Sequence, residues 1–375
     1  MADVPRKPRD AECSEYVIEN YKVDFRDEAH KKNRINYFDT IFFHKGWLFN
    51  QMKAQAIFAN YEKSLICMTN EYWVPMDFII QHGRGLIEEK IKLGKIQSKG
   101  NRIRLGDDHH FYFKNYRDIE NNVSIRLDDV QLDDEVLEIK ARRVTYFDQA
   151  ATNLAAYGQE LVGDVDIRRY DAEMNGDGWL PKSLKESNLA NSLGVACIFE
   201  VRDHGKPVLV PRYRPERRSK AGHVHAVMSD GAWHCSSSGV VEYIDLDLNL
   251  GVGESKCIPL KSIETAIVRE IETESRLYLE DDYDLVPLCF SREIPRAGKP
   301  QFFYKAVIRE DKFDNLPKFI SHLQKSFKPE GWEYDDAKLS SPEFEKMLRY
   351  LRGSGLVDIA DKFTYEGFAN IQFGR

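Results

Sequence analysis

The stretch SIETAIVREIETESRL, residues 262–277, has the spacing of an amphipathic helix that carries two acidic residues on its apolar side. At about 100° per residue, Glu270 and Glu274 fall near the middle of the arc that the apolar residues define. An inward carboxylate is costly unless a cation meets it, because a buried charge loses its hydration. The apolar arc consists of Ile263, Ala266, Ile267 and Ile271.

Three environments would satisfy this pair of carboxylates. An Arg or Lys from another element would neutralise them, and a solvated crevice would keep them hydrated. A hard metal ion is the third, because Mg²⁺ takes oxygen ligands and is shared between carboxylates and the phosphates of a substrate. The periodicity does not choose among the three. The other two glutamates of the helix, Glu264 and Glu272, fall away from the arc, where we expect solvent.

Length and composition indicate a globular protein of two domains. The chain has 375 residues, of which 42% are hydrophobic and 31% charged. It contains no run of about 18 apolar residues that would span a membrane, and its N-terminus has no apolar core typical of a secretory signal. The net charge of −7 gives no global basic field that would favour nucleic acid.

The cysteines predict the compartment. They are widely scattered and include no CxxC pair, which indicates free thiols in a reducing environment. We therefore expect a cytoplasmic protein with no disulfide. The six are Cys13, Cys67, Cys197, Cys235, Cys257 and Cys289.

The pattern divides the chain into a polar leader (residues 1–20), an accessory α+β domain (residues 21–170) and a final segment (residues 171–375) that ends in a helical extension. The accessory domain alternates short aromatic and β-branched runs with Gly, Asn and Asp, as strands joined by turns do. Residues 75–96 are the exception, because their pattern predicts a helix.

Two stretches early in the final segment partly resemble metal-binding motifs. Residues 171–182 have part of the spacing of a calcium loop, but the twelfth position is Lys182, whose charge opposes the ion. Further on, a set of histidines and a cysteine suggests zinc, yet the spacing matches no closed structural site. We interpret this set as ordinary loop and strand residues. Its members are His223, His225, His234 and Cys235.

Residues 194–215, GVACIFEVRDHGKPVLVPRYRP, predict a hairpin with a tight Asp-His-Gly turn. This hairpin, a loop with SGVVE (residues 238–242), the helix and strands within residues 284–310 follow one another in an order that resembles the Nudix hydrolase superfamily. The box of that family contains an Arg-Glu-apolar triplet followed by an acidic pair. Arg269, Glu270 and Ile271 match the triplet, Glu274 matches the second acid, and Gly239 and Glu242 resemble the Gly-x-x-Glu part of the preceding loop.

The resemblance covers about residues 191–310, roughly a third of the chain. Aligned on the triplet, the first Glu of the box falls on Lys261, the first acid of the pair on Thr273, and the terminal Gly on Arg276. An insertion, residues 243–261, also separates the loop from the helix. Acids within the insertion that are available to restore a lost position are Asp245, Asp247 and Glu254.

The resemblance implies that Glu270, Glu274 and Glu242 are ligands of Mg²⁺ or Mn²⁺, with Glu270 and Glu274 as the catalytic pair. Such an ion polarises phosphoryl oxygens for attack by water and offsets the charge that develops. We expect the carboxylates of Glu270 and Glu274 to lie within about 5 Å of each other and to open onto a cleft.

Arginines supply the other part of the expected site. Arg212 and Arg214 end the hairpin, where their forked donors would bind substrate phosphate; the alternative is a solvated strand end. Arg269 is expected to brace the junction of loop and helix rather than to contact substrate.

The implied fold class is α/β (α+β), a Nudix-like α/β/α sandwich with a mixed sheet that follows the accessory α+β domain. The implied function is a Mg²⁺-dependent hydrolase of a nucleoside diphosphate linked to another moiety, a pyrophosphatase. The lost acids favour a catalytically inactive module of the same fold that binds a nucleotide or regulates. A protein-interaction scaffold is a third class.

The distribution of charge further narrows the classes of molecule that the protein is expected to bind. Residues 90–104 are basic, but a solvated helix and turn fits the overall acidity better than nucleic-acid binding does. We expect a nucleotide-type small molecule as substrate or ligand and no membrane. A homodimer is left open.

Overall fold

The computed structural model describes residues 61–73, 103–105, 111–113, 122–133, 136–149, 152–153, 161–162, 165–166, 171–175, 178–214, 231–251, 253–293, 296–326, 334–352 and 362–374. The predicted leader (residues 1–20), the predicted helix (residues 75–96) and most of the basic stretch lie outside these residues. So do Cys13, His223 and His225.

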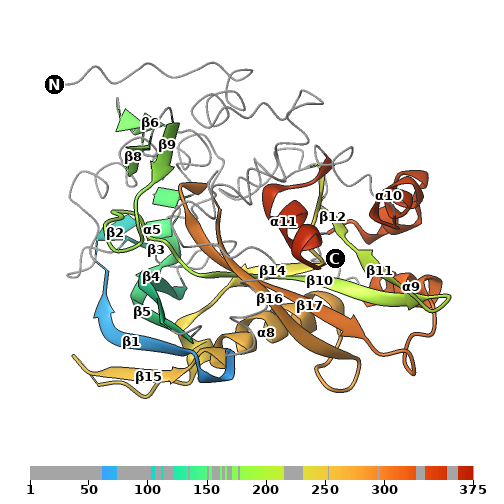
Figure 1. Ribbon diagram of the computed structural model, residues 1–375, viewed down its shortest axis with the longest axis horizontal. Helices are drawn as coiled ribbons and strands as arrows, with labels where there is room; N and C mark the ends of the chain where they lie inside the picture. Colours follow the sequence, from blue (N-terminus) through green and yellow to red (C-terminus); the bar gives the residue numbers. More distant parts are fainter. Residues whose placement is uncertain are drawn as a thin grey trace.

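The fold belongs to the α+β class, and its described strands form two main sheets joined by short elements (Figure 1). The first sheet has the order β15-β1-β5-β4, in which β1 runs parallel to β5 and the other neighbours are antiparallel. Residues of β5 alternate between core and solvent, since Leu137 and Ile139 are buried while Glu138 and Lys140 are exposed. The strands are β1 (Leu65–Tyr72), β4 (Val123–Asp133), β5 (Val136–Thr145) and β15 (Ser255–Pro259).

The second sheet is mixed, with the order β11-β10-β17-β16 and with β14 also paired to β10. Its central strands β10 and β17 are parallel and mostly buried, as expected for strands covered on both faces. The predicted hairpin is confirmed: His204 and Gly205 have φ values of 51° and 74°, the positive values that a tight two-residue turn requires. The strands are β10 (Gly194–Asp203), β11 (Lys206–Val210), β14 (Ser237–Val240), β16 (Tyr283–Glu293) and β17 (Lys299–Ile308).

Helices pack on both faces of the second sheet. Phe199 of β10 packs edge-on against Phe319 of α9, with ring centroids 5.7 Å apart. Phe303 of β17, whose register partner Ala196 faces the opposite way from Phe199, packs against Phe373 of α11 at 5.8 Å. The helices are α8 (Glu264–Ser275), α9 (Leu316–Ser326), α10 (Pro342–Arg352) and α11 (Tyr365–Gly374).

Short elements complete the described structure. Four two-stranded ribbons pair β2 with β3, β6 with β7, β8 with β9 and β12 with β13 among the described residues. Their bounds are β2 (Ile103–Leu105), β3 (Phe111–Phe113), β6 (Leu161–Val162), β7 (Val165–Asp166), β8 (Ala172–Asn175), β9 (Gly178–Pro181), β12 (Arg212–Arg214) and β13 (Ala232–His234). The remaining turns of helix are η1 (Tyr61–Lys63), α5 (Tyr146–Gln149), η3 (Tyr243–Leu246), η4 (Leu260–Ile263) and η6 (Asp336–Ser340).

The insertion of residues 243–261 provides the edge strand of the first sheet. It forms η3 and then β15, which pairs with β1 (Figure 1). Cys67 and Cys257 are direct partners in this pairing and form a disulfide, so the prediction of free thiols is wrong for these two. Their separation of 190 residues hid the contact. The free cysteines of the described residues, Cys197, Cys235 and Cys289, are buried.

One hydrophobic core extends through both sheets. Ile66 and Ile139 of the first sheet belong to the same buried cluster as Phe199 of the second and Ile267 of α8. The domain boundary at residues 170 and 171 stays a prediction, and the packing joins the two sides of it. Among the described residues, no helix combines the length and apolar character needed to cross a bilayer.

Candidate functional site

Helix α8 has the two faces that its periodicity predicts. Ala266, Ile267 and Ile271 are buried, whereas Glu270 and Glu274 between them are half-buried. The helix follows directly on η4 and ends at Arg276, which adopts the left-handed conformation with φ 57°. Of the two glutamates expected in solvent, Glu272 is exposed and Glu264 is half-buried.

Strand β14 holds both inward carboxylates. A Cβ on Gly239 would lie 2.2 Å from Oε1 of Glu270, so this side chain occupies space that only glycine leaves open. Two residues earlier, Ser237 donates a hydrogen bond to Oε2 of Glu274. Residues two apart on a strand face the same way. The two carboxylates therefore lie side by side along one face of β14.

Arg269 connects the helix to the loop before it. Its guanidinium donates to both carboxylate oxygens of Asp245 in η3, at 2.9 and 3.0 Å, to Glu270 at 2.8 Å and to the carbonyl of Val240 at 3.3 Å. Burial lowers the pKa of Arg269, but the bond to Asp245 and the charge of Glu270 outweigh it and raise that pKa. The prediction that Arg269 braces this junction is confirmed.

Glu242, the third expected metal ligand, lies at the start of η3. It is half-buried and accepts a hydrogen bond of 3.0 Å from Nδ2 of Asn122, just before β4. In the described part of the chain, three ligand atoms converge within 4.8 Å of one another only at a different place, so Glu242, Glu270 and Glu274 form no such group. Of the acids offered by the insertion, Asp245 is already committed to Arg269.

The two arginines of β12 occupy different environments. Arg212 is buried and forms a two-pronged ion pair with Asp336 of η6, at 2.8 and 2.6 Å. Its carbon Cζ also lies 3.9 Å from the ring centroid of Tyr334. Arg214 is half-buried and donates to Oγ of Ser238 on β14 at 3.3 Å. Arg214 therefore lies nearer to solvent than Arg212, whose donors face protein acceptors.

A buried polar cluster that sequence spacing missed lies beside Arg214. His234, Cys235 and Glu366 place one ligand atom each within 4.8 Å of one another. His234 Nδ1 lies 2.5 Å from Oγ1 of Thr364, and burial, with the charges of Arg214 and Arg296, lowers the pKa of His234. The local sequence names His234 and Cys235, but Glu366 comes from α11, more than 100 residues later.

Chemically, this cluster is better suited to structure than to a metal. The carboxylate of Glu366 accepts from Nε2 of Gln301 at 2.7 Å and from Arg296 at 3.4 Å. Both ring nitrogens of His234 already have hydroxyl partners, Thr364 at 2.5 Å and Ser238 at 3.0 Å, so the imidazole has no lone pair left for a metal. A Cβ on Gly367 would lie 2.6 Å from Cα of His234, so α11 is packed backbone to backbone against this strand. The cluster holds the C-terminal helix in place.

Comparison with known proteins adds no family. No family model matches the chain, and no curated protein is similar to it.

Proposed function

We propose that the chain is a Mg²⁺-dependent hydrolase of a nucleoside diphosphate linked to another moiety, with a site built on α8 and β14. The observation that carries this proposal is the contact of Glu270 with Gly239, because a missing Cβ leaves room for a carboxylate against the strand. Glu274 lies beside it, held by Ser237. Two half-buried carboxylates on one helical face provide oxygen donors for a cation.

The donor set fits Mg²⁺, which binds through one or two carboxylates and substrate phosphates and keeps several waters. Glu270 and Glu274 would hold the ion. When bound, it would polarise the phosphoryl oxygens that water attacks. The chain's own residues would supply the other roles: Ser237 and Arg269 donate to the carboxylates, and Arg214, which donates to Ser238 on β14, would orient a phosphate.

The end of α8 is compatible with the Nudix resemblance, although many helices end in this way. The box ends in Gly at the position of Arg276, and Arg276 has φ 57°. Glycine adopts this left-handed conformation without the steric cost that other residues meet. The backbone therefore has the shape that the family's glycine serves, although the side chain differs.

The alternative is a catalytically inactive module of the same fold that binds a nucleotide or regulates. The positions of the two lost acids favour it. Lys261 is exposed and pairs with Glu62 at 2.9 Å, and Thr273 is exposed, so neither side chain adds a ligand beside Glu270. With only two carboxylates, such a site would bind metal weakly.

A substrate screen tests the proposal. Dinucleotides, nucleotide sugars and nucleoside triphosphates are incubated with Mg²⁺ or Mn²⁺, and release of phosphate or nucleoside monophosphate is followed. We expect turnover that Glu270→Gln abolishes and that Glu272→Gln, an exposed change on the same helix, leaves intact. Metal-dependent nucleotide binding without turnover would support the inactive module. The absence of both binding and turnover would exclude both proposed functions.

The lost acids offer a gain-of-function test. Thr273→Glu adds a carboxylate one residue from Glu274 and is expected to tighten Mn²⁺ binding. Combined with Lys261→Glu, it is expected to raise activity. Calorimetry beside product release measures both effects, and an unchanged metal affinity in the double variant would leave the non-catalytic alternative.

We also propose a cytoplasmic location, and a homodimer stays open. In a reducing compartment the Cys67–Cys257 disulfide would be exposed to cellular thiols, which can reduce it. Fractionation of cells with the disulfide state trapped by alkylation tests the location, and sedimentation tests the dimer.

A further inference from the structure

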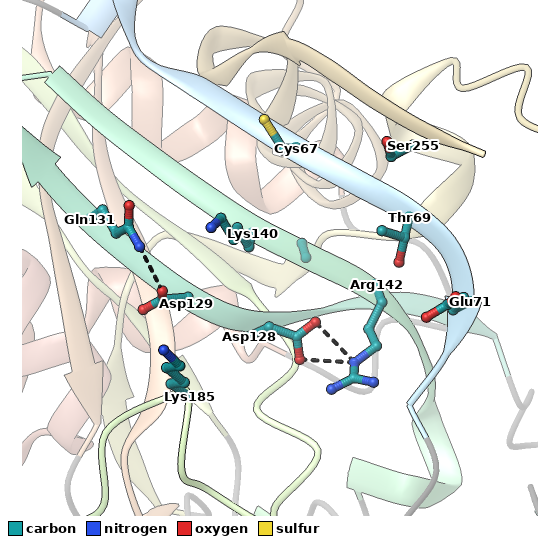
Figure 2. Close-up of a pocket in the computed structure, with 11 residues that line it drawn as sticks. Cys67, Thr69, Glu71, Asp128, Asp129, Gln131, Lys140, Arg142, Lys185 and Ser255 are labelled. Carbon is teal, nitrogen blue, oxygen red and sulfur yellow. Dashed lines mark hydrogen bonds and ion pairs between the residues drawn. The ribbon is translucent and has the colours of Figure 1, made fainter. Parts of the chain in front are cut away.

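The outer face of the first sheet carries a groove of about 500 Å³ that is lined mostly by polar and charged residues (Figure 2). Its floor is formed by outward residues of β1, β5 and β4, including Cys67, Lys140 and Asp129. Lys185, in the turn that precedes β10, also lines it. The groove lies on the opposite face of the sheet from the hydrophobic core, so it is separate from the site on α8.

The disulfide borders this groove. Cys67 is among the groove's lining residues, and Cys257 beside it on the edge strand β15 is exposed. Figure 2 shows Cys67 on β1 with Lys140 on the neighbouring strand β5. In the register of the sheet, Cys67 pairs with Cys257 on one side and with Lys140 on the other.

This order decides which sulfur a thiolate attacks. Thiol–disulfide exchange is a displacement in which the entering and leaving sulfurs lie on opposite sides of the attacked one. Since β15 and β5 flank β1 on opposite sides, an attack on Cys67 approaches over β5, through the groove and past Lys140. The leaving sulfur is then that of Cys257. An attack on Cys257 would come from beyond the edge of the sheet, where the groove offers nothing.

The charges of the groove define the thiol that fits it. Lys140 and Lys185 are exposed and form no ion pair with any other residue that the structure describes. They are available to bind carboxylates. Glu71 and Asp129 supply acids for an ammonium group, and Asp129 is held by Gln131 at 3.0 Å. Carboxylates and an ammonium on one small molecule are the chemistry of a short peptide.

We propose that this groove is a thiol-exchange site, in which a small zwitterionic peptide thiol reduces the Cys67–Cys257 disulfide through a mixed disulfide on Cys67. In the first step the peptide thiolate forms a bond to Sγ of Cys67, and Cys257 leaves as a thiolate that takes up a proton. In the second step another peptide thiolate attacks the peptide sulfur and releases Cys67. Two peptide thiols are oxidised to one disulfide, and the protein gains two thiols. This inference does not depend on the proposed hydrolase.

Glutathione is the probe, and uncharged 2-mercaptoethanol is its reference. The folded full-length chain with Cys13→Ser is treated with each thiol at low salt, quenched with acid and mapped by mass spectrometry. Each rate is divided by the rate with a short unstructured peptide disulfide. We expect the adduct on Cys67. We expect the ratio of glutathione to 2-mercaptoethanol to fall about three-fold for each lysine removed, the effect of a unit charge about 6 Å away in water.

The variants are Lys140→Ala and Lys185→Ala, and the matched control is Lys256→Ala. Lys256 adjoins Cys257 in sequence but faces the other side of the strand, so its removal is expected to leave the ratio unchanged. The proposal is overturned by an adduct confined to Cys257, by a ratio that the groove lysines do not change, or by a bond that glutathione reduces only in urea. As a second measurement, Cys257→Ser with oxidised glutathione should trap a stable adduct on Cys67.

Discussion

Replacing Gly239 by alanine separates the role of the α8 carboxylate from its contribution to stability. The added Cβ would lie 2.2, 2.4 and 2.7 Å from Oε1, Cδ and Cγ of Glu270. All three atoms belong to the end of a flexible side chain, so the carboxylate is expected to swing away from β14 while the backbone stays. The φ of Gly239 is not among the positive values, so alanine brings no backbone strain.

The expected cost in stability is small because two terms oppose each other. Removing a glycine from a strand stabilises by about 0.5–1 kcal/mol. Losing the Arg269–Glu270 ion pair, whose side chains are 35% and 18% exposed, costs about 0.2–1 kcal/mol. The free energy of unfolding should therefore change by less than about 1 kcal/mol. The metal affinity should fall on the order of 10–100-fold, as when a group that positions a ligand is lost.

Urea unfolding and calorimetric titration with Mn²⁺ measure the two quantities on the same preparation. Glu272→Gln serves as the control, because this exposed residue lies on the opposite side of α8. A Gly239→Ala protein with the wild-type Mn²⁺ affinity would refute the assignment of Glu270 as a ligand. A decrease of about 3 kcal/mol or more in the free energy of unfolding, well above the roughly 1 kcal/mol expected, would show that the side chain of Glu270 cannot move aside.

Three further predictions follow from burial and backbone shape. Arg212→Met should lower the free energy of unfolding by about 3–5 kcal/mol because it leaves Asp336 buried without its partner; a change in substrate affinity with stability intact would instead support the phosphate role. Arg276→Gly should raise the free energy of unfolding by about 0.5 kcal/mol, since it relieves a left-handed residue, and a thermal scan showing a loss would contradict this. Burial raises the pKa of Glu264 from 4.5 to about 7, so the folded state keeps a proton that the unfolded state releases. The contribution of Glu264 to the free energy of unfolding is fully present below pH 4.5 and falls as the pH rises to 7, by about 1 kcal/mol after allowance for solvent screening. Urea titrations across this range should show this decrease in the free energy of unfolding for the wild type and not for Glu264→Gln.

Local periodicity was enough to predict α8 and its faces. The apolar arc is buried, Glu270 and Glu274 are half-buried between its members, and Glu272 is exposed. The hairpin of β10 and β11 was equally predictable, because the residue types at His204 and Gly205 indicate a tight two-residue turn. These features depend on residues a few positions apart.

Partners distant in the chain were not predictable in this way. Asp336 pairs with Arg212 across 124 residues, and nothing near Arg212 marks it as half of a buried ion pair. Glu264 is half-buried instead of exposed because it forms a side-chain hydrogen bond with Tyr61 of η1, the turn before β1. The prediction of free thiols failed for the same reason, since cysteine spacing says nothing about which strands become neighbours.

Strand β15 also ties the two sheets together mechanically. It pairs with β1 along its whole length, and only η4, residues 260–263, separates it from the first turn of α8. A shift of the edge of the first sheet is therefore transmitted to the start of the helix that carries Glu270. Cutting the chain at residue 170 would leave one piece without its edge strand and the other with that strand unpaired, its backbone donors and acceptors open to association with other chains.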